Sequence, residues 1–269
     1  MQKRKRKWIG AALLCAFTIA ACGKEAGTKT PGGGTGTEIP GGDSGTVTAV
    51  PGNGTSNDAE AAPKISFEIL TESEKDAQGG EFIRAQYPVF SVSGEGYEAL
   101  AAALAFLNEE WKGQADTFLA DMKEAAQEYQ KSVDSSYLFR QDINANITRC
   151  DQEIVSILVT RSVEEGGPHP NNDFHSRNFD AKTGEVLRLS DVVAVDDALK
   201  EKIKAELYAN YSELEFDEAL LEADIQGALT DSELEWYFMD GQICIGFKEG
   251  SFGFGHAEGS LGVLIPVEK

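Results

Sequence analysis

The most restrictive feature of the sequence is a segment that cannot form a core, Gly23 to Pro63. It contains 11 Gly, 7 Thr and 4 Pro among its 41 residues and has no aromatic residue. Because such a segment buries too little apolar surface to offset the entropy lost on ordering, we predict that it is a disordered tether. As a flexible coil it would reach about 35 Å. The folded part is therefore predicted in Lys64 to Lys269.

The segment before the tether has the order of a secretory signal. Five cations, Lys3 to Lys7, precede an uncharged apolar stretch, Trp8 to Ala21, which is too short to span a bilayer comfortably. Ile19-Ala20-Ala21-Cys22 resembles the lipobox of bacterial lipoproteins. The resemblance implies that residues 1–21 are a cleaved signal peptide and that Cys22 carries acyl chains that hold it in the membrane, with residues 22–63 as anchor and tether. We expect an extracytoplasmic protein anchored to the bacterial cell membrane; a plain secreted protein is the alternative.

The charge of the chain excludes some classes of ligand. Without residues 1–21 the chain has 19 Lys and Arg against 45 Asp and Glu, a net charge near −26. Nucleic acids and anionic lipid surfaces are bound by clustered Lys and Arg, so we expect neither as a ligand. The acidic excess has two explanations that charge alone does not separate, namely solubility and attraction of a cationic partner.

Two cysteines follow the tether, and each lies in a predicted strand. An oxidising exterior permits a disulfide between Cys150 and Cys244, but a bridge needs Cα atoms within about 7 Å of each other. Two buried thiols are the other alternative. The sequence leaves both open.

Hydrophobic periodicity predicts an α+β fold. Alternation predicts strands at 64–70 and 82–92, with an edge or a bulge at Pro88. Apolar residues at three- and four-residue steps between Tyr97 and Tyr129 predict a long helix, which Gly113 leaves as one kinked helix or two.

The second half of the chain is predicted to contain more strands and two shorter helices. Asp240-Gly241 favours a type I′ hairpin, Ala181 to Gly184 favours a turn, and Ser190-Asp191 is a candidate helix cap. The predicted strands lie at 137–149, 153–163, 175–180, 185–189, 233–239, 242–247 and 261–267, and the helices at 196–211 and around 220–225. We therefore predict antiparallel sheets packed with a long N-terminal helix and shorter C-terminal helices, in two subdomains.

An ordered series of short motifs runs from residue 166 to the end of the chain. The motifs are Gly166-Gly167-Pro168-His169-Pro170-Asn171, Asn178-Phe179-Asp180, Thr183-Gly184, Leu189-Ser190-Asp191, a hairpin ending in Phe247, Ala257-Glu258-Gly259 and Ile265-Pro266. Together they resemble the C-terminal domain of the RsiV-like family. That family includes the ectodomain of a lysozyme-sensing anti-sigma factor and the non-catalytic region of PdaC-type peptidoglycan deacetylases.

The resemblance extends towards the tether. The preceding strand with Tyr87-Pro88 and the long helix resemble the PdaC-type partner domain, which implies an N-terminal α+β subdomain at 64–163 and an RsiV-like domain at 164–269. Seven residues precede the apolar stretch and the chain closes on a strand, so we expect neither anti-sigma activity nor a deacetylase domain. Gly253 to Ala257 departs from the tyrosine-bearing segment of the relatives.

Candidate ligand contacts lie at the tip of the 166–180 segment and near the C-terminus. They are His169, Asn171, Asn172, His175, Phe254 and His256. A zinc site needs three or four convergent ligands, and the three histidines in this set are the only such combination, so a metal-dependent envelope hydrolase is one alternative. We instead predict no catalytic residue, no metal and no cofactor.

The predicted function is therefore binding. We expect a non-catalytic, lipid-anchored module for an envelope glycan such as peptidoglycan, or for a protein ligand. A receptor or inhibitor for a cationic enzyme such as lysozyme is a second alternative, which the family resemblance suggests and the acidic charge permits.

Overall fold

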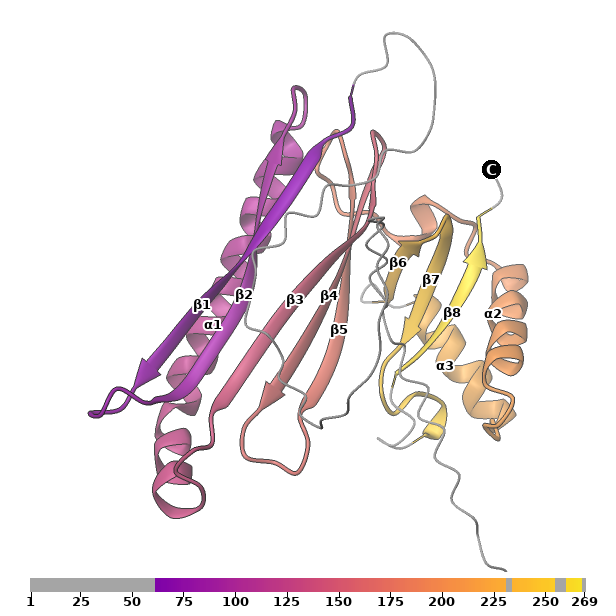
Figure 1. The fold of residues 1–269 in the computed structure, drawn as a ribbon. Helices are drawn as coiled ribbons and strands as arrows, with labels where there is room; N and C mark the ends of the chain where they lie inside the picture. Colours follow the sequence, from indigo (N-terminus) through magenta and orange to yellow (C-terminus); the bar gives the residue numbers. More distant parts are fainter. Residues whose placement is uncertain (1–60, 231–233, 255–259, 268–269) are drawn as a thin grey trace, which may run out of the picture. The chain divides into compact units, whose positions relative to one another are not determined.

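The computed structural model describes residues 61–230, 234–254 and 260–267. These residues form eight strands, three α-helices and two short 3-10 helices (Figure 1). In chain order the elements are β1 (Lys64–Lys75), β2 (Glu81–Ser93), α1 (Glu98–Ser132), β3 (Phe139–Cys150), β4 (Ile154–Glu164), β5 (Asn171–Asp180), η1 (Leu189–Asp191), α2 (Asp197–Asn210), α3 (Glu218–Thr230), β6 (Glu235–Met239), β7 (Gln242–Phe247), η2 (Ser251–Gly253) and β8 (Leu261–Pro266). The α+β class predicted from periodicity is confirmed.

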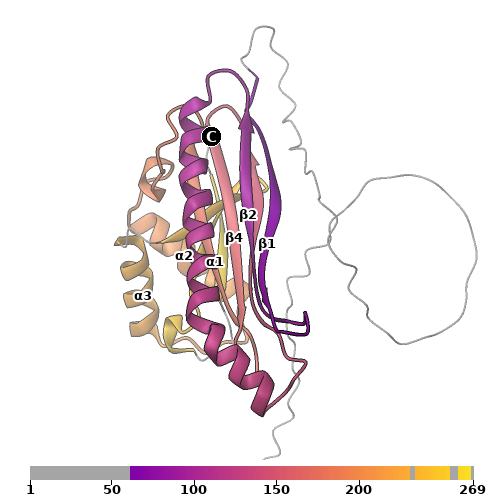
Figure 2. The ribbon, with the colours of Figure 1, turned by 90° about the vertical axis from the view of Figure 1, so that its left-hand side faces the viewer.

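Strands β1 to β5 form one sheet in chain order, and β6 to β8 form a second, antiparallel sheet. The strand pairs are antiparallel as predicted, with one exception: β2 pairs with β3 in parallel, from Ile83–Phe139 to Gln86–Asp142. Helix α1 connects these two strands, and a helix is the usual crossover between parallel neighbours. It lies along one face of the five-stranded sheet (Figure 2).

Strand β2 is interior rather than an edge, although it contains Pro88. Pairing with β3 ends at Gln86, so Pro88 follows the point at which the two strands separate. On the other side Pro88 is paired with Ile69 of β1. Beyond the proline, the Asn108 side chain of α1 accepts from Phe90 N (2.8 Å) and donates to Phe90 O (3.0 Å), which satisfies the backbone where β3 has diverged.

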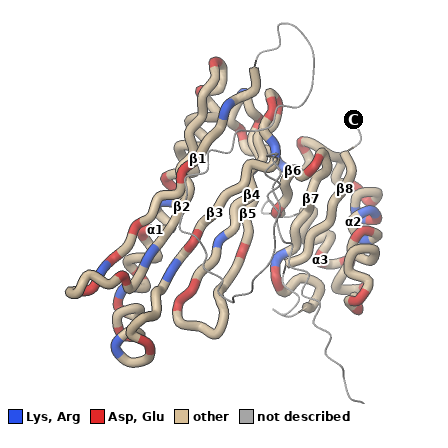
Figure 3. Tube along the Cα trace, viewed as in Figure 1, with Lys and Arg blue, Asp and Glu red and all other residues tan. Residues whose placement is uncertain are grey.

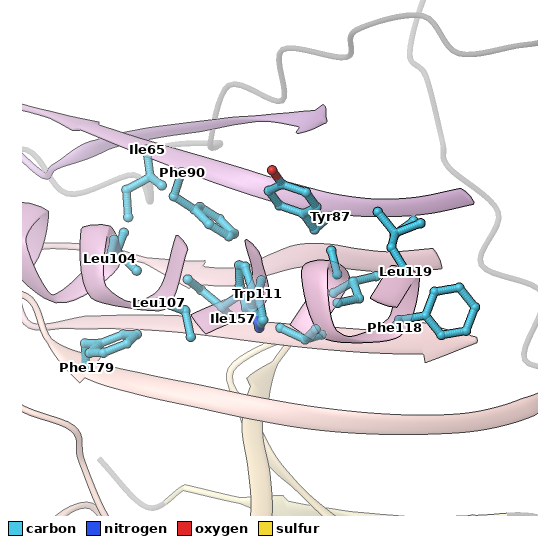
Figure 4. Packing of buried hydrophobic residues seen from close by; sticks show 14 of the residues in the cluster. Ile65, Tyr87, Phe90, Leu104, Leu107, Trp111, Phe118, Leu119, Ile157 and Phe179 are labelled. Atoms are coloured by element: carbon cyan, nitrogen blue, oxygen red, sulfur yellow. The ribbon is translucent and has the colours of Figure 1, made fainter. Parts of the chain in front are cut away.

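Helix α1 is one helix of 35 residues and not two helices separated at Gly113. Its apolar stripe packs on the sheet (Figure 4); Leu104, Leu107 and Trp111 are each at most 4% exposed. Burial of a leucine side chain contributes about 1.5–3 kcal/mol, so this stripe is the main stabilising feature of the first core.

A second core lies between helices α2 and α3 and the three-stranded sheet. Leu199, Ile203 and Leu207 of α2 pack there with Leu221 and Ile225 of α3.

Two local features in this half were predicted in part. The hairpin turn has positive φ at Asp240 (52°) and Gly241 (77°), which confirms the type I′ prediction. The helix cap is Asp196, whose side chain accepts from Leu199 N, whereas Ser190-Asp191 forms a separate 3-10 turn.

The two buried clusters divide between Ala181 and Leu189. The domain boundary expected after Val163 falls between β4 and β5, which are neighbours in one sheet. The five-stranded sheet therefore extends into the segment assigned to the RsiV-like domain. Within the described ranges, no helix combines the length and apolar character needed to cross a membrane.

In the structure, Cys150 and Cys244 are both thiols and no disulfide joins them. This is the second of the two alternatives that the sequence left open. The Cys150 Sγ donates to Pro63 O at 3.3 Å. Burial, with a contribution from Asp151, raises the pKa of this thiol to about 11, which keeps it protonated and unreactive at neutral pH.

Gly113 provides a test of the helix assignment. It lies inside α1, and a Cβ added there would meet nothing within 4 Å. Gly113→Ala should therefore raise the free energy of unfolding by about 1 kcal/mol, since glycine is the poorer helix former. Urea denaturation followed by circular dichroism measures this change. Gly227→Ala in α3, where a Cβ also meets nothing, is the matched control; a loss of stability in Gly113→Ala alone would contradict a continuous α1.

Candidate functional site

The segment that carries most of the family motif becomes β5, an edge strand of the five-stranded sheet. Alternate side chains of a strand point to opposite faces. On one face, Phe174, Ser176 and Asn178 contact the second sheet. A Cβ on Gly246 of β7 would lie 2.4 Å from the Phe174 Cζ, so any other residue at this position would require the ring to move.

Buried hydroxyl and amide side chains join β6 to the first sheet. Ser176 Oγ accepts from Trp236 N (2.9 Å), and Asn178 Nδ2 donates to Trp236 O (2.6 Å). One step further along, Ser156 Oγ of β4 accepts from Phe238 N (3.1 Å) and donates to Asn178 Oδ1 (2.7 Å). These three side chains supply the hydrogen bonds that a neighbouring strand would otherwise give. We call this set, with Glu235, the polar seam.

Glu235 begins β6 and completes the seam. Its side chain is 7% exposed. The carboxylate accepts from His175 Nδ1 (3.0 Å), from Ser176 N (2.5 Å) and from Ser176 Oγ (2.9 Å). Burial by itself raises the pKa of Glu235, but the hydrogen bonds from His175 and Ser176 outweigh it, so the pKa lies below the ordinary 4.5. Glu235 is therefore a buried, hydrogen-bonded anion at neutral pH.

His175 lies between two carboxylates. Its Nδ1 contacts Glu235, and its Nε2 is 3.7 Å from Asp173 Oδ1. Asp173 is in turn held by Arg161, whose Nη2 donates at 2.7 Å. The imidazole is thus fixed from both sides.

A cleft of about 710 Å³ opens beside the seam. Its lining includes the apolar residues Val186, Val195 and Leu229 and the residues around Glu235. Three cationic side chains also line it; they are Arg177, Arg188 and Lys248.

The seam superficially contains the residue types of a hydrolytic triad, but their geometry does not form a proton relay. In such a relay the serine donates to the imidazole. Here Ser176 Oγ donates to Glu235 and accepts from Trp236 N. The hydroxyl proton is therefore already used in the bond to Glu235. Ser176 and His175 are also neighbours on one strand, so their side chains leave it on opposite faces. The arrangement can orient and bind, and it does not activate Ser176.

The predicted ligand contacts that the structure describes do not converge. His175 alone lines the cleft beside the seam. Asn171 lines a different groove, and His169 is exposed with Nδ1 3.2 Å from Pro170 O. Asn172 is exposed as well. Phe254 packs on Phe216 within the second core, with ring centroids 5.2 Å apart.

Cys22 and His256 lie outside the described residues. Among the residues that are described, no three His, Cys, Asp or Glu side chains are grouped in a way that could hold a metal ion. The three-histidine alternative, which requires His256, stays a prediction.

Sequence patterns did not reveal the residues that build the site. Ser176 and Asn178 lie at alternate positions of a predicted strand, which places them on one face but does not say what covers it. Glu235 is a single acid in an apolar run, Leu234 to Phe238, and that run resembles an ordinary strand. A single acid within an apolar run was the one available signal, because charged residues are rarely placed among residues that form a core.

No protein-family model and no curated protein matches the chain. Two solved structures are similar to it. The first is a DUF3298-family protein from Bacteroides fragilis NCTC 9343, which matches with a TM-score of 0.56 and 15% identity over 77% of this chain and 91% of its own. The second is a DUF3298-family protein from Pseudomonas aeruginosa PAO1, with a TM-score of 0.41 and 15% identity over 78% of this chain and 92% of its own.

The fold resembles that of a DUF3298-family protein. RsiV-like C-terminal regions belong to that domain family, so the fold agrees with the resemblance seen in the motifs. The match with the Bacteroides protein covers most of both chains, and it therefore spans more than the C-terminal sheet.

The pKa of Glu235 predicts an acid-sensitive seam. Because its folded-state pKa lies below its unfolded-state value, its contribution to stability is fully present above pH of about 4.5 and is lost as the pH falls through the folded-state pKa. Urea unfolding between pH of about 7 and 3 should show a steeper loss for the natural chain than for Glu235→Gln. Parallel slopes for the two chains would show that the Glu235 charge does not stabilise the seam.

Proposed function

We propose that the protein is a lipid-anchored, extracytoplasmic, non-catalytic binding module, and that its cleft takes a carboxylate-bearing ligand of the cell envelope. The observation that carries this proposal is the gathering of Arg177, Arg188 and Lys248 around one cleft in a chain of net charge −21. Peptidoglycan stem peptides have the matching chemistry, since they combine carboxylates with short apolar side chains.

The three cations differ in their availability. Lys248 is exposed and has no ion-pair partner among the described residues. Arg188 is paired with Asp191 but 76% exposed. Arg177 is held by Glu110 at 3.6 Å and donates to Ser176 O at 3.0 Å. Lys248 therefore offers the first contact to an incoming carboxylate, and Arg177 offers a fixed guanidinium close to the seam.

The remaining walls favour binding over chemistry. Glu235, Ser176 and Asn178 form their hydrogen bonds within the protein, so their role is to shape the cleft. The ligand would be contacted by the cations and by the apolar residues of the lining. A pocket with apolar sides and few polar anchors is the usual form of a ligand site.

Exchange of the cleft cations tests the proposed ligand. Arg177→Gln/Lys248→Gln should weaken calorimetric binding of a muropeptide with a free stem-peptide carboxylate by roughly tenfold, since it removes two charge contacts. Lys64→Gln/Lys131→Gln removes the same charge from β1 and α1 and is the matched control. Equal weakening in both double variants would assign the effect to net charge, and unchanged affinity in the cleft variant would disprove the cleft as the site.

Lysozyme is a second candidate partner, favoured by the acidic surface. Asp and Glu occur on every α-helix and on both sheets (Figure 3). Long-range attraction of this kind raises the association rate and is screened by salt. The same calorimetry at low salt distinguishes the two partners: saturable lysozyme binding that is insensitive to the cleft variant would place the partner on the acidic surface, and absence of such binding would remove this candidate.

The proposed anchor rests on the lipobox resemblance of residues 19–22. Cys22→Ala should abolish incorporation of a radiolabelled fatty acid and move the protein from the detergent phase to the aqueous phase, because the acyl chains supply the membrane affinity. Cys15→Ala, in the apolar stretch, is the control and should keep the label. Labelling that survives in Cys22→Ala would contradict the anchor.

A further inference from the structure

A second concavity lies on the opposite face of the five-stranded sheet, beneath α1. It has a volume of about 640 Å³ and is lined by α1, by β3 and β4, and by the first residue of β5. Phe118 and Met122 give it an apolar side; Phe118 belongs to the buried cluster of the first core (Figure 4). We call it the α1 groove.

Gln141 of β3 is the unexplained residue in the α1 groove. The described residues include five buried polar side chains, and the other four are Ser156, Ser176, Asn178 and Glu235 of the polar seam, all hydrogen-bonded. Gln141 is 3% exposed, lines the groove, and its Nε2 has no hydrogen-bond partner among the described residues. Leaving such a donor unpaired costs about 1–3 kcal/mol, so a ligand group that accepts from it would be favoured.

The charges around Gln141 restrict what that partner is. Asp121 and Glu165 line the groove without an ion-pair partner among the described residues. The cation that lines it, Arg161, is neutralised by Asp173. An anionic ligand would therefore meet uncompensated carboxylates.

A purely cationic ligand does not fit either. An ammonium group has donors and no acceptor, so it leaves the Gln141 Nε2 unpaired. A hydroxyl group both accepts and donates, and it satisfies the amide and a carboxylate together. Thr117, Gln114 and Asn171 extend the same mixture of donors and acceptors along the groove.

We infer that the α1 groove binds a neutral, hydroxyl-rich oligosaccharide. Gln141 donates a hydrogen bond to one of its hydroxyl groups, and Phe118 and Met122 contact the apolar face of a sugar ring. Gly113 lies in the lining, and a Cβ there would meet nothing within 4 Å, so the groove has free space at this position. The site is separate from the cleft beside the polar seam and does not depend on the function proposed for that cleft.

The test measures binding of a neutral N-acetylglucosamine oligomer to the full-length chain by calorimetry. Gln141→Met keeps the length of the side chain and removes the donor, so it should weaken binding at least about tenfold while leaving the chain as stable or more stable. Lys248→Gln, which changes the cleft and no residue of the groove, should bind the oligomer as the natural chain does. Saturable binding confined to a cationic, deacetylated oligomer would overturn the inference.

A second pair of variants keeps the test independent of Gln141. Gly113→Gln places a side chain in the groove and should abolish binding, whereas Gly113→Ala should bind normally. Three results would overturn the inference: no saturable binding of the neutral oligomer by the natural chain, equal affinity in Gln141→Met, or a marked loss of stability in Gln141→Met, which would show that the amide has a partner within the protein.

Discussion

The rest of the described fold depends on hydrogen bonds between side chains of one sheet and the backbone of the next. In the described part of the chain, β5 and β6 each have an edge with no neighbouring strand, apart from a bridge between Phe179 and Val186. Uncovered edges leave N–H and C=O groups without partners. Ser156, Ser176 and Asn178 supply those partners to β6. Direct pairing would bring the strands within about 4.8 Å. Here side chains make the connection instead, and the cleft lies beside them at Glu235.

Local patterns in the sequence predicted the elements well, because the determining interactions are near in sequence. Positive φ at Asp240 and Gly241 needs only two residues, and the stripe of α1 needs only its own period. The parallel pairing of β2 with β3 was missed because it depends on how α1 folds back over the sheet. Glu235 was missed for the same reason: its three hydrogen-bond donors are about 60 residues away.

The segment Gly166 to Asp180 becomes β5 and the turn before it, and its contacts join the two sheets. Phe174, Ser176 and Asn178 are alternate residues of β5, and each has a specific partner in the second sheet. Of these three, Asn178 alone is among the motif residues. The histidines of the segment differ, since His175 belongs to the network around Glu235 and His169 is exposed. Sequence alone could not separate the two histidines, because both lie among the same polar neighbours.

The ion pair between Arg177 and Glu110 links the two concave surfaces. Arg177 lines the cleft, while Glu110, on α1, lines the groove. A carboxylate that binds Arg177 in the cleft competes with Glu110 for the same guanidinium. Glu110 would then add a further uncompensated charge to the groove. Any such coupling is reciprocal by thermodynamic linkage. A groove ligand that stabilises the ion pair between Glu110 and Arg177 therefore weakens the binding of a carboxylate to Arg177 in the cleft. The electrostatics of the cleft and of the groove are thus set partly by one residue pair that spans the edge of the sheet.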